Sequence, residues 1–369
     1  MQSYCSEYNI YIVPHKCAIL PKYVLRSSCT LDNEGIVESE LLLPILDTRT
    51  ESAALTAAIQ AIGANSTPYL WMSRWSEEEV AALAELRTLV GDRLRSVPQY
   101  PEVVGDRKLL RFLRGHDYNV SKAASMYCQF LDWRLEHRVD EIRESIVRGG
   151  LNHPSKFPNG AKILSLIPQV VLAHEVSDSF GCPLMIDQYC FSPTNVMEQI
   201  TLEECLNFVI HCLEYRSIIL EQLSEEAERK KIQSMIAGTR QSSEPYGTIL
   251  HACVIRDLRG VGLEHFCANG AEIISLMIKI SSDNYPEFMR RCFIINTPFI
   301  FSTIWYFIKN LLAPRSIAKI VVLGEDYLES MSEEIKCEQL TAHLCGKFSI
   351  GNVPFDFASR NEGLIPKTD

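Results

Sequence analysis

The sequence lacks an excess of positive charge. Its 36 Lys and Arg residues are outnumbered by 46 Asp and Glu residues, which gives a formal net charge of −10. Proteins that bind the phosphate backbone of nucleic acids usually carry a basic footprint, so this composition argues against a nucleic-acid partner. It also argues against a general attraction to anionic membranes, although a local basic patch can still act there.

The spaced motifs of common enzymes and metal sites are also missing. The sequence contains no HExxH, GxSxG or CxxC motif, and residues 260–262 lack the third glycine of a dinucleotide fingerprint. His211-Cys212 followed by Arg216 resembles a phosphatase loop, but the spacing is too short, and a cysteine on a helix face is the favoured interpretation. We therefore expect no catalytic residues, no metal site and no cofactor.

Signals for secretion or lipid anchoring are absent as well. The N-terminus has no basic segment followed by a long apolar run, and no myristoylation or CaaX motif occurs. The 13 cysteines are scattered without paired spacing, as in proteins of a reducing compartment. These features predict a cytoplasmic protein.

One long hydrophobic stretch, residues 292–312, is present, and its only charged residue is Lys309. The stretch is long enough to cross a bilayer, but residues 296–298 (Asn-Thr-Pro) divide it. Residues 292–296 before the proline predict a buried strand. Residues 299–312 predict a helix that is apolar on nearly every face and suits a protein core or a membrane interface.

The remaining sequence begins with helical patterns and then alternates between strand and helix patterns. Ser76 and Glu79 form a capping box, and residues 106–114 and 120–139 follow as helices, with Leu135 among the inward-facing residues of the last. The alternation after residue 160 implies a mixed α/β sheet. The predicted strands are residues 161–167, 183–189, 249–255 and 317–323, and the predicted helices are residues 201–237 and 263–283.

A series of short motifs runs through both parts of the chain. They are Leu109 to Arg114 (LLRFLR), Trp133-Arg134, Asp257-Leu258-Arg259-Gly260, Tyr285-Pro286-Glu287, residues 294–301 (IINTPFIF) and residues 314–319 (PRSIAK). Together they resemble the CRAL-TRIO lipid-binding family, and most closely its Sec-fourteen type of phosphatidylinositol/phosphatidylcholine transfer protein. The resemblance covers residues 76–347. It implies an α/β fold in which a helical N-lobe precedes a mixed sheet and helices that enclose an apolar lipid pocket.

The resemblance also divides the chain. We expect an N-terminal extension at residues 1–72, the helical N-lobe at 73–150, the lipid-binding lobe at 151–347 and a C-terminal tail at 348–369. The extension matches nothing in the family. It is a candidate for binding a protein partner, and partial disorder is the alternative.

The resemblance implies a headgroup site for a phosphoinositide. Glu287, Ser316 and Lys319 match the family's ligands, and His116 stands where the family often has an arginine that reaches the phosphate. A carboxylate accepts hydrogen bonds from inositol hydroxyls, while an ammonium and a hydroxyl donate to phosphate oxygens. A local ion pair of Glu287 and a solvated Lys319 form the alternative interpretation.

The family's choline-lipid site is not matched. Ala252 and Val254 replace its hydroxyl residues, Met185 replaces its tyrosine and Phe288 replaces its arginine. The sequence therefore favours phosphatidylinositol or another apolar ligand over phosphatidylcholine.

The helix of residues 299–312 corresponds to the family's mobile gate over the lipid pocket. Its candidate gate residues are Phe299, Phe301, Trp305, Phe307 and Ile308. A buried core helix is the alternative interpretation. The sequence thus predicts a protein that holds one phospholipid and exchanges it during transient, peripheral contact with membranes. A non-transferring lipid sensor or scaffold with a degenerate headgroup site is the alternative, and an enzyme is the least favoured class.

Overall fold

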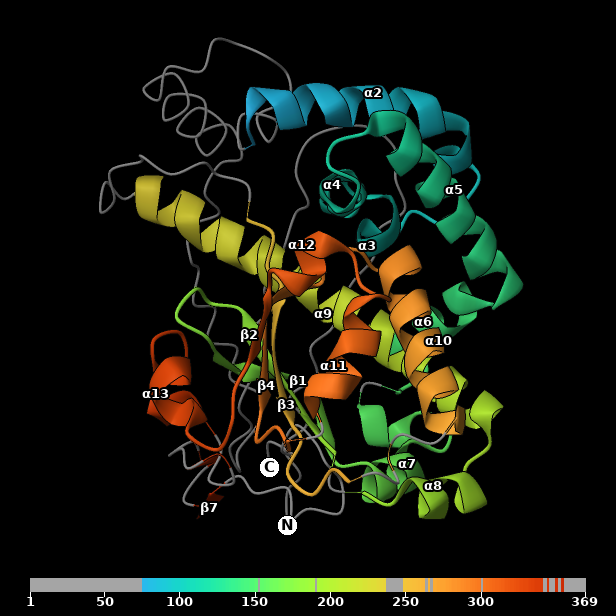
Figure 1. Ribbon diagram of the computed structural model, residues 1–369. Coiled ribbons are helices and arrows are strands. Elements are labelled where there is room, and N and C mark those ends of the chain that lie inside the picture. Colours follow the sequence, from blue (N-terminus) through green and yellow to red (C-terminus); the bar gives the residue numbers. More distant parts are fainter. Residues whose placement is uncertain are drawn as a thin grey trace, which may run out of the picture. The chain divides into compact units, whose positions relative to one another are not determined.

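The computed structural model describes residues 75–151, 153–189, 191–236, 248–262, 265, 268–299, 301–340, 344, 349–350 and 353–354 (Figure 1). All of them belong to one unit, Ala58–Asp369. The predicted extension at residues 1–72 and most of the tail at 348–369 lie outside the described residues, so these domain boundaries stay predictions.

The first part of the described chain is helical, as the sequence predicts. Its helices are α2 (Glu77–Arg95), α3 (Pro101–Val104), α4 (Asp106–Gly115), α5 (Val120–Glu136) and α6 (Val139–Val147). The capping box is confirmed: the Ser76 hydroxyl accepts from the backbone N–H of Glu79, and the Glu79 carboxylate accepts from the backbone N–H of Ser76. Helices α2, α4 and α5 share one apolar core that includes Leu83, Leu86, Leu109, Leu110, Leu113, Tyr127 and Phe130.

Two expectations for this part are wrong. The helix predicted over residues 120–139 ends at Glu136, because Arg138 takes a left-handed conformation (φ 52°) and α6 starts anew at Val139. Leu135 does not face inward, since 81% of it is exposed. Its neighbour Arg134 takes the inward direction instead and is 2% exposed.

The second part contains a five-stranded mixed sheet. Its strands are β1 (Gln169–Ser177), β2 (Pro183–Gln188), β3 (Ala252–Asp257), β4 (Met289–Ile295) and β5 (Ile320–Val322), in the spatial order in which they occur in the chain. β1 pairs antiparallel with β2, and the other neighbours are parallel. The parallel strands therefore all begin at one edge of the sheet and end at the other.

Helices cover both faces of the sheet (Figure 1). One face packs against α7 (Gly160–Leu166), α8 (Pro193–Gln199), α9 (Leu202–Ile236) and α11 (Phe301–Lys309), and we call this apolar cluster the inner cluster. The opposite face packs against α13 (Tyr327–Ser332). Side chains on β3 alternate between the two faces, with Ala252 and Val254 in the inner cluster and Cys253 and Ile255 on the other side.

The remaining elements connect these layers. They are α10 (Ala268–Asn284), α12 (Pro314–Ile317), the 3-10 turns η2 (Pro154–Lys156) and η4 (Cys337–Gln339), and the two-stranded pair β6 (Ser349–Ile350) and β7 (Val353–Pro354). Asn296 ends β4 in a left-handed conformation, and its side-chain amide donates to the Asp257 carboxylate at 2.7 Å. This bond ties the Asp-Leu-Arg-Gly turn to the Asn-Thr-Pro turn.

The strand predicted over residues 161–167 is wrong, because α7 occupies this segment. Ile163 and Leu164 are both buried although they are neighbours, which fits a helix better than the alternating faces of a strand. The strand of this region, β1, lies after Pro168. The strand predicted from residue 317 starts later, at Ile320, because residues 314–317 form α12.

The hydrophobic stretch divides as predicted into strand β4 and helix α11, although α11 is shorter than the predicted helix. Across the part of the chain that the structure describes, no helix combines the length and hydrophobicity needed to span a membrane. Cys212 lies buried on α9, as the helix-face interpretation predicts, and burial raises the pKa of its thiol to about 12.

Candidate functional site

Three of the predicted headgroup residues lie at the edge of the sheet where the parallel strands begin. Glu287 belongs to the turn between α10 and β4, and Lys319 follows α12 and precedes β5. The backbone carbonyl of Lys319 accepts from the N–H of Cys292 at 2.9 Å, which holds the lysine beside the start of β4. Ser316 lies on α12 and is partly buried.

Glu287 and Lys319 are in direct contact. The Lys319 Nζ donates to Oε2 of Glu287 at 2.8 Å, and the carboxylate side chain is only 9% exposed. The backbone of Glu287 is held in the left-handed region (φ 58°), where its carbonyl accepts a hydrogen bond from Arg111 of α4. A non-glycine residue in this region is uncommon and is often found at functional sites.

Arg315 joins this pair, although it was not among the predicted site residues. Its Nε lies 3.1 Å from Oε1 of Glu287 as an ion pair, although the geometry is not that of a hydrogen bond. Its Nη1 donates to the exposed carboxylate of Asp117 at 3.2 Å. Asp117 belongs to the loop between α4 and α5, so Arg315 links this loop to Glu287. The position of Arg315 inside the Pro-Arg-Ser motif was the signal that could have found it.

His116 is placed in the same loop, but its ring is engaged elsewhere. Its Nδ1 lies 2.8 Å from the carbonyl oxygen of Phe112, and the two rings stack. A carbonyl can only accept, so Nδ1 carries the proton, and the neutral ring then offers Nε2 only as an acceptor. A neutral His116 therefore cannot donate to a phosphate oxygen. Within the described contacts, Asp117 is the residue of this loop that reaches Arg315.

A close approach between α4 and the Tyr-Pro-Glu turn fixes this arrangement. A Cβ added to Gly115 would lie 2.9 Å from the Cβ of Pro286, which is too short for a contact without movement. Only glycine at this position allows the last turn of α4 to pack on the turn that carries Glu287.

Gly115→Ala is expected to lower the free energy of unfolding by about 1–3 kcal/mol, because the added methyl group overpacks a rigid contact. Gly91→Ala in α2 is the matched control, since its nearest contact is the flexible end of Arg95 at 3.4 Å. The control should gain up to about 1 kcal/mol from helix propensity. Urea unfolding measures both, and a Gly115→Ala variant as stable as the wild type would contradict this packing.

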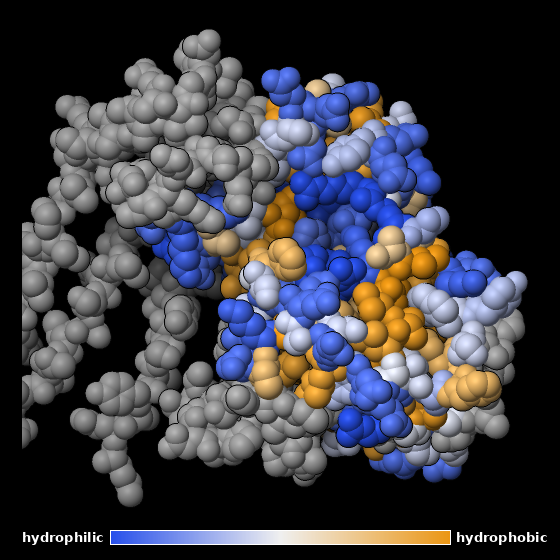
Figure 2. All heavy atoms as spheres, turned by 60° about the vertical axis from the view of Figure 1, so that its left-hand side comes forward, coloured by the Kyte–Doolittle hydropathy of each residue, from blue (hydrophilic) through white to orange (hydrophobic). Residues whose placement is uncertain are grey.

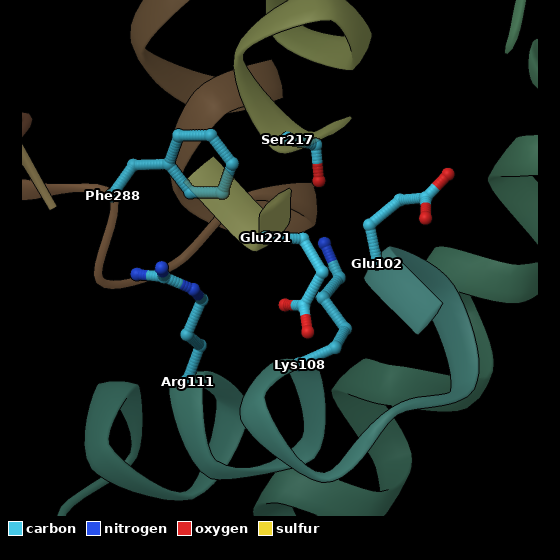
Figure 3. A pocket seen from close by; sticks show the side chains of 6 residues that line it. All are labelled: Glu102, Lys108, Arg111, Ser217, Glu221 and Phe288. Atoms are coloured by element: carbon cyan, nitrogen blue, oxygen red, sulfur yellow. The ribbon is translucent and has the colours of Figure 1, made fainter. Parts of the chain in front are cut away.

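Basic residues of α4 and acidic residues of α9 meet behind the headgroup residues. Figure 3 shows Lys108 and Arg111 rising from α4, with Lys108 directed toward Glu221 and Ser217 of α9 and Arg111 turned toward Phe288. These side chains, with Glu102, line a small polar cavity of roughly the size of one water molecule. Burial lowers the pKa of Lys108 well below its usual range and lowers that of Arg111 to about 10.

The acidic side of this contact is a polar stripe along α9. Its members recur at helical spacing and are largely buried: Glu214, Ser217, Glu221, Ser224 and Glu228. Arg107 pairs with Glu221 and Glu228. Arg134 of α5 donates to both oxygens of Glu214 at 2.7 and 3.2 Å, and the Tyr285 hydroxyl donates to Glu214 at 2.6 Å. The N-lobe is thus bonded to the sheet lobe through buried charges, and this stripe was not predicted although its spacing is visible in the sequence.

The family comparison agrees with this architecture. Residues 171–346 match the model of the CRAL/TRIO domain. The chain carries a CRAL/TRIO domain. The match lies within the lipid-binding lobe predicted at residues 151–347, and the helices α2 to α6 precede this CRAL/TRIO domain as the N-lobe does in the expected fold.

Curated relatives match most of the length of this chain. The phosphatidylinositol/phosphatidylcholine transfer protein SFH12 of Arabidopsis thaliana is 28% identical over 73% of this chain and 44% of its own length. The Sec14 cytosolic factor of Schizosaccharomyces pombe is 28% identical over 67% of this chain and 76% of its own length. The chain therefore spans less than half of the length of SFH12. Among solved structures, the crystal structure of Sfh5 aligns with 70% of this chain and 84% of its own at 14% identity, with a TM-score of 0.45.

The candidate gate residues of the CRAL/TRIO domain lie in different environments. Phe301 is 5% exposed, stacks on Trp305 at 6.1 Å and belongs with it to the inner cluster. Phe299 is fully exposed just before α11, and Ile308 is half-buried on the helix. Phe307 lies on α11, but its side chain is outside the described residues. On the face drawn in Figure 2, apolar side chains reach the surface beside a strongly hydrophilic recess.

The positions that replace the choline-lipid residues come together in the CRAL/TRIO domain. Met185, Ala252 and Val254 are members of the inner cluster, and Phe288 packs against it. These four replacements are therefore all apolar and gather in or against the inner cluster, at the place where the family's choline-lipid residues would lie.

Proposed function

We propose that this chain binds one phospholipid, phosphatidylinositol in particular, and transfers it between membranes. The observation that carries the proposal is the charged contact of Glu287 with Lys319 and Arg315. These residues lie at one edge of the sheet, and the inner cluster covers one face of the same sheet. The names of the relatives, which are phosphatidylinositol/phosphatidylcholine transfer proteins, support it. In this proposal the acyl chains lie in a hollow between the sheet and α11.

The headgroup would bind by exchange of partners within the charged cluster. The Glu287 carboxylate accepts from inositol hydroxyls, while Lys319, Arg315 and the Ser316 hydroxyl donate to phosphate oxygens. Asp117 is 89% exposed in its pair with Arg315, and an exposed ion pair contributes only about 0–1 kcal/mol. A phosphate can therefore displace Asp117 from Arg315 at small cost. A neutral His116 ring takes no part in binding the phosphate in this scheme, because its Nδ1 faces the Phe112 carbonyl oxygen.

The acyl chains would supply most of the binding free energy. Each buried CH₂ group contributes about 0.8 kcal/mol, so a single acyl chain exceeds the contribution of any one headgroup contact. The headgroup contacts then select among lipids that share the same chains. The apolar replacements at Met185, Ala252, Val254 and Phe288 disfavour a choline headgroup inside the hollow, so phosphatidylinositol is the proposed ligand.

Exchange would take place during transient, peripheral contact with a membrane, with α11 as the gate. Phe299, just before this helix, is 100% exposed, and Tyr306 on the helix is 60% exposed. Leu311, just after the helix, is 48% exposed. Such side chains suit insertion at a membrane interface. We further propose that the protein acts in the cytoplasm, that it is not an enzyme, and that it needs no cofactor beyond the bound lipid.

Lys319→Ala is expected to reduce phosphatidylinositol loading by at least about tenfold, because it removes a charge-assisted hydrogen bond to phosphate. Loading is measured after incubation with vesicles that contain phosphatidylinositol and phosphatidylcholine. Lys230→Ala is the matched control, since Lys230 pairs with Glu226 at the same distance of 2.8 Å on α9. Unchanged loading in the Lys319→Ala variant would remove the headgroup assignment. Loading without movement between vesicles would point to a lipid sensor instead.

A further inference from the structure

A charged pair lies on the inner face of the sheet, and the proposed function does not use it. Arg256 of β3 and Asp187 of β2 are register partners on neighbouring strands. Because side chains alternate along a strand, Arg256 shares its face with Ala252 and Val254, two members of the inner cluster. The pair therefore lies on the side of the sheet where the acyl chains are proposed to bind.

The guanidinium of Arg256 is poorly satisfied by the residues that the structure describes. Its Nε is buried and has no hydrogen-bond partner among them, and Oδ2 of Asp187 is 3.6 Å away, beyond hydrogen-bond distance. An arginine among apolar side chains is costly unless an acceptor reaches it. The site therefore has a donor without an acceptor.

Arg256 is also more accessible than its place in the sheet predicts. β3 is the middle strand, and Ala252 and Val254 on the same face are each 4% exposed, yet 41% of the Arg256 side chain is exposed. The Nε of Arg256 is thus buried, while another part of the same side chain is accessible. Arg256 lies near the carboxyl end of β3 and Asp187 near that of β2, whereas Lys319 and Glu287 lie at the opposite edge, where β4 and β5 begin.

The charges around Arg256 favour an anion. Burial raises the pKa of Asp187, and Arg256 and Arg216 of α9 act in the opposite direction on the same carboxyl. Two guanidinium groups thus act electrostatically on one carboxylate, which leaves an excess of positive charge. Arg216 uses its Nε to donate to the carbonyl of Val171 at 2.9 Å, so Arg256 is the group that remains to be satisfied.

We propose that Arg256 binds the anionic group of a long-chain amphiphile, a carboxylate or a phosphate, inside the hollow. The proposal rests on the proposed function, because the amphiphile's tail would occupy the same inner cluster as the acyl chains. The planar fork of the guanidinium suits bidentate binding of either anion. Asp187 orients Arg256 and competes with the ligand for it. Arg256 is thus a specificity-determining residue for a second class of ligand, at the opposite end from the headgroup site.

The test compares three probes that share one apolar chain: oleate, oleoyl lysophosphatidate and the uncharged oleyl alcohol. Their dissociation constants for the full chain are measured by displacement of a fluorescent fatty acid. The wild type is expected to bind at least one of the two anions about tenfold or more tightly than the alcohol, the gain of a charge-assisted hydrogen bond. The anion that binds more tightly identifies the source of the charge, a carboxylate or a lipid phosphate.

Two variants and one control assign this preference to Arg256. Arg256→Met should bring the ratio of anion to alcohol affinity close to unity, while Asp187→Asn should raise it, because the competing carboxylate is gone. Arg259→Met is the matched control, since Arg259 is an exposed arginine in the turn that follows β3, and it should leave the ratio unchanged. The opposite effects of the first two variants separate binding from a merely structural role, and Asp187→Asn keeps the test valid if Arg256→Met does not fold.

Equal binding of the anions and the alcohol by the wild type would overturn the proposal, as would an anion preference that survives in Arg256→Met. The Lys319→Ala variant separates this result from the proposed function. If phosphatidylinositol loads in a Lys319-dependent manner without any anion preference in the hollow, only the Arg256 site is wrong. If phosphatidylinositol does not load but the preference depends on Arg256, the headgroup assignment is wrong and the Arg256 site stands.

Discussion

Glu214→Ala is expected to lower the free energy of unfolding by about 3–5 kcal/mol, because it leaves a buried arginine without its partner. Glu214 is 0% exposed and accepts hydrogen bonds from Nη1 and Nη2 of Arg134 and from the Tyr285 hydroxyl. Arg134 itself is 2% exposed and, among the residues that the structure describes, would keep only the half-buried Asp140 as an acidic partner. The loss should therefore exceed that of the other stability variant, Gly115→Ala.

The arrangement around Glu214 joins three segments that are far apart in the sequence. Arg134 belongs to the N-lobe, Glu214 to α9 and Tyr285 to the turn that also carries Glu287. Arg134 and Tyr285 lie in the Trp-Arg and Tyr-Pro-Glu motifs, which the family resemblance had marked without giving a reason. The structure supplies the reason: both motifs satisfy one buried carboxylate.

Urea unfolding at neutral pH measures this loss. Glu203→Ala is the control, because Glu203 lies exposed on the same helix, and its replacement should change stability by no more than about 0.5 kcal/mol. A loss below about 1 kcal/mol for Glu214→Ala would mean that the buried network does not hold the two lobes together.

His251→Gln is expected to make the protein less sensitive to acid. Burial lowers the pKa of His251 to about 2, and the nearby cations Arg111, Lys319, Arg114 and Arg290 act in the same direction. The native state thus keeps His251 neutral, whereas the unfolded chain binds a proton below the ordinary histidine pKa of 6.5. The stability of the native state with a neutral His251 is fully present above the pKa of 6.5 that the histidine has in the unfolded chain. This stability is lost progressively as the pH falls from 6.5 toward about 2.

The size of the effect follows from the width of this window. Each pH unit within it costs about 1.4 kcal/mol, so between about pH 7 and about pH 4.5 the histidine removes about 2–3 kcal/mol. His251→Gln should reduce the acid-induced loss of stability by this amount, as measured by urea unfolding at both pH values. His137→Gln, at an exposed position, controls for the loss of a histidine. Identical losses in His251→Gln and wild type would show that the native state does not keep His251 neutral.

Much of the fold could be predicted because its elements follow local rules. The capping box at Ser76, the apolar spacing of α4 and the apolar strand β4 before Pro298 were all legible in the sequence. Short apolar runs were less reliable, since residues 161–167 suit either a strand or a helix until their neighbours are known. Leu135 was misplaced for a different reason: a buried ion pair decided which side of α5 faces the core.

The site was predictable only in part. Glu287, Ser316 and Lys319 came from the motifs, and their proximity follows from neighbouring parallel strands that begin at the same edge. The roles of Arg315 and His116 could not be read in this way. They depend on which loop reaches which helix: Asp117 meets Arg315, while His116 turns back to Phe112. The charges of Arg256 and Asp187 likewise gain meaning only when the two strands are placed in register.

The central claim is that this chain selects phosphatidylinositol. Its most direct test is mass spectrometry of the lipid bound to the full chain after incubation with vesicles of equal phosphatidylinositol and phosphatidylcholine content. We expect one bound phospholipid per chain and a strong enrichment of phosphatidylinositol that disappears in Lys319→Ala. A protein that emerges without lipid, or with both lipids in the proportion of the vesicles, would contradict it.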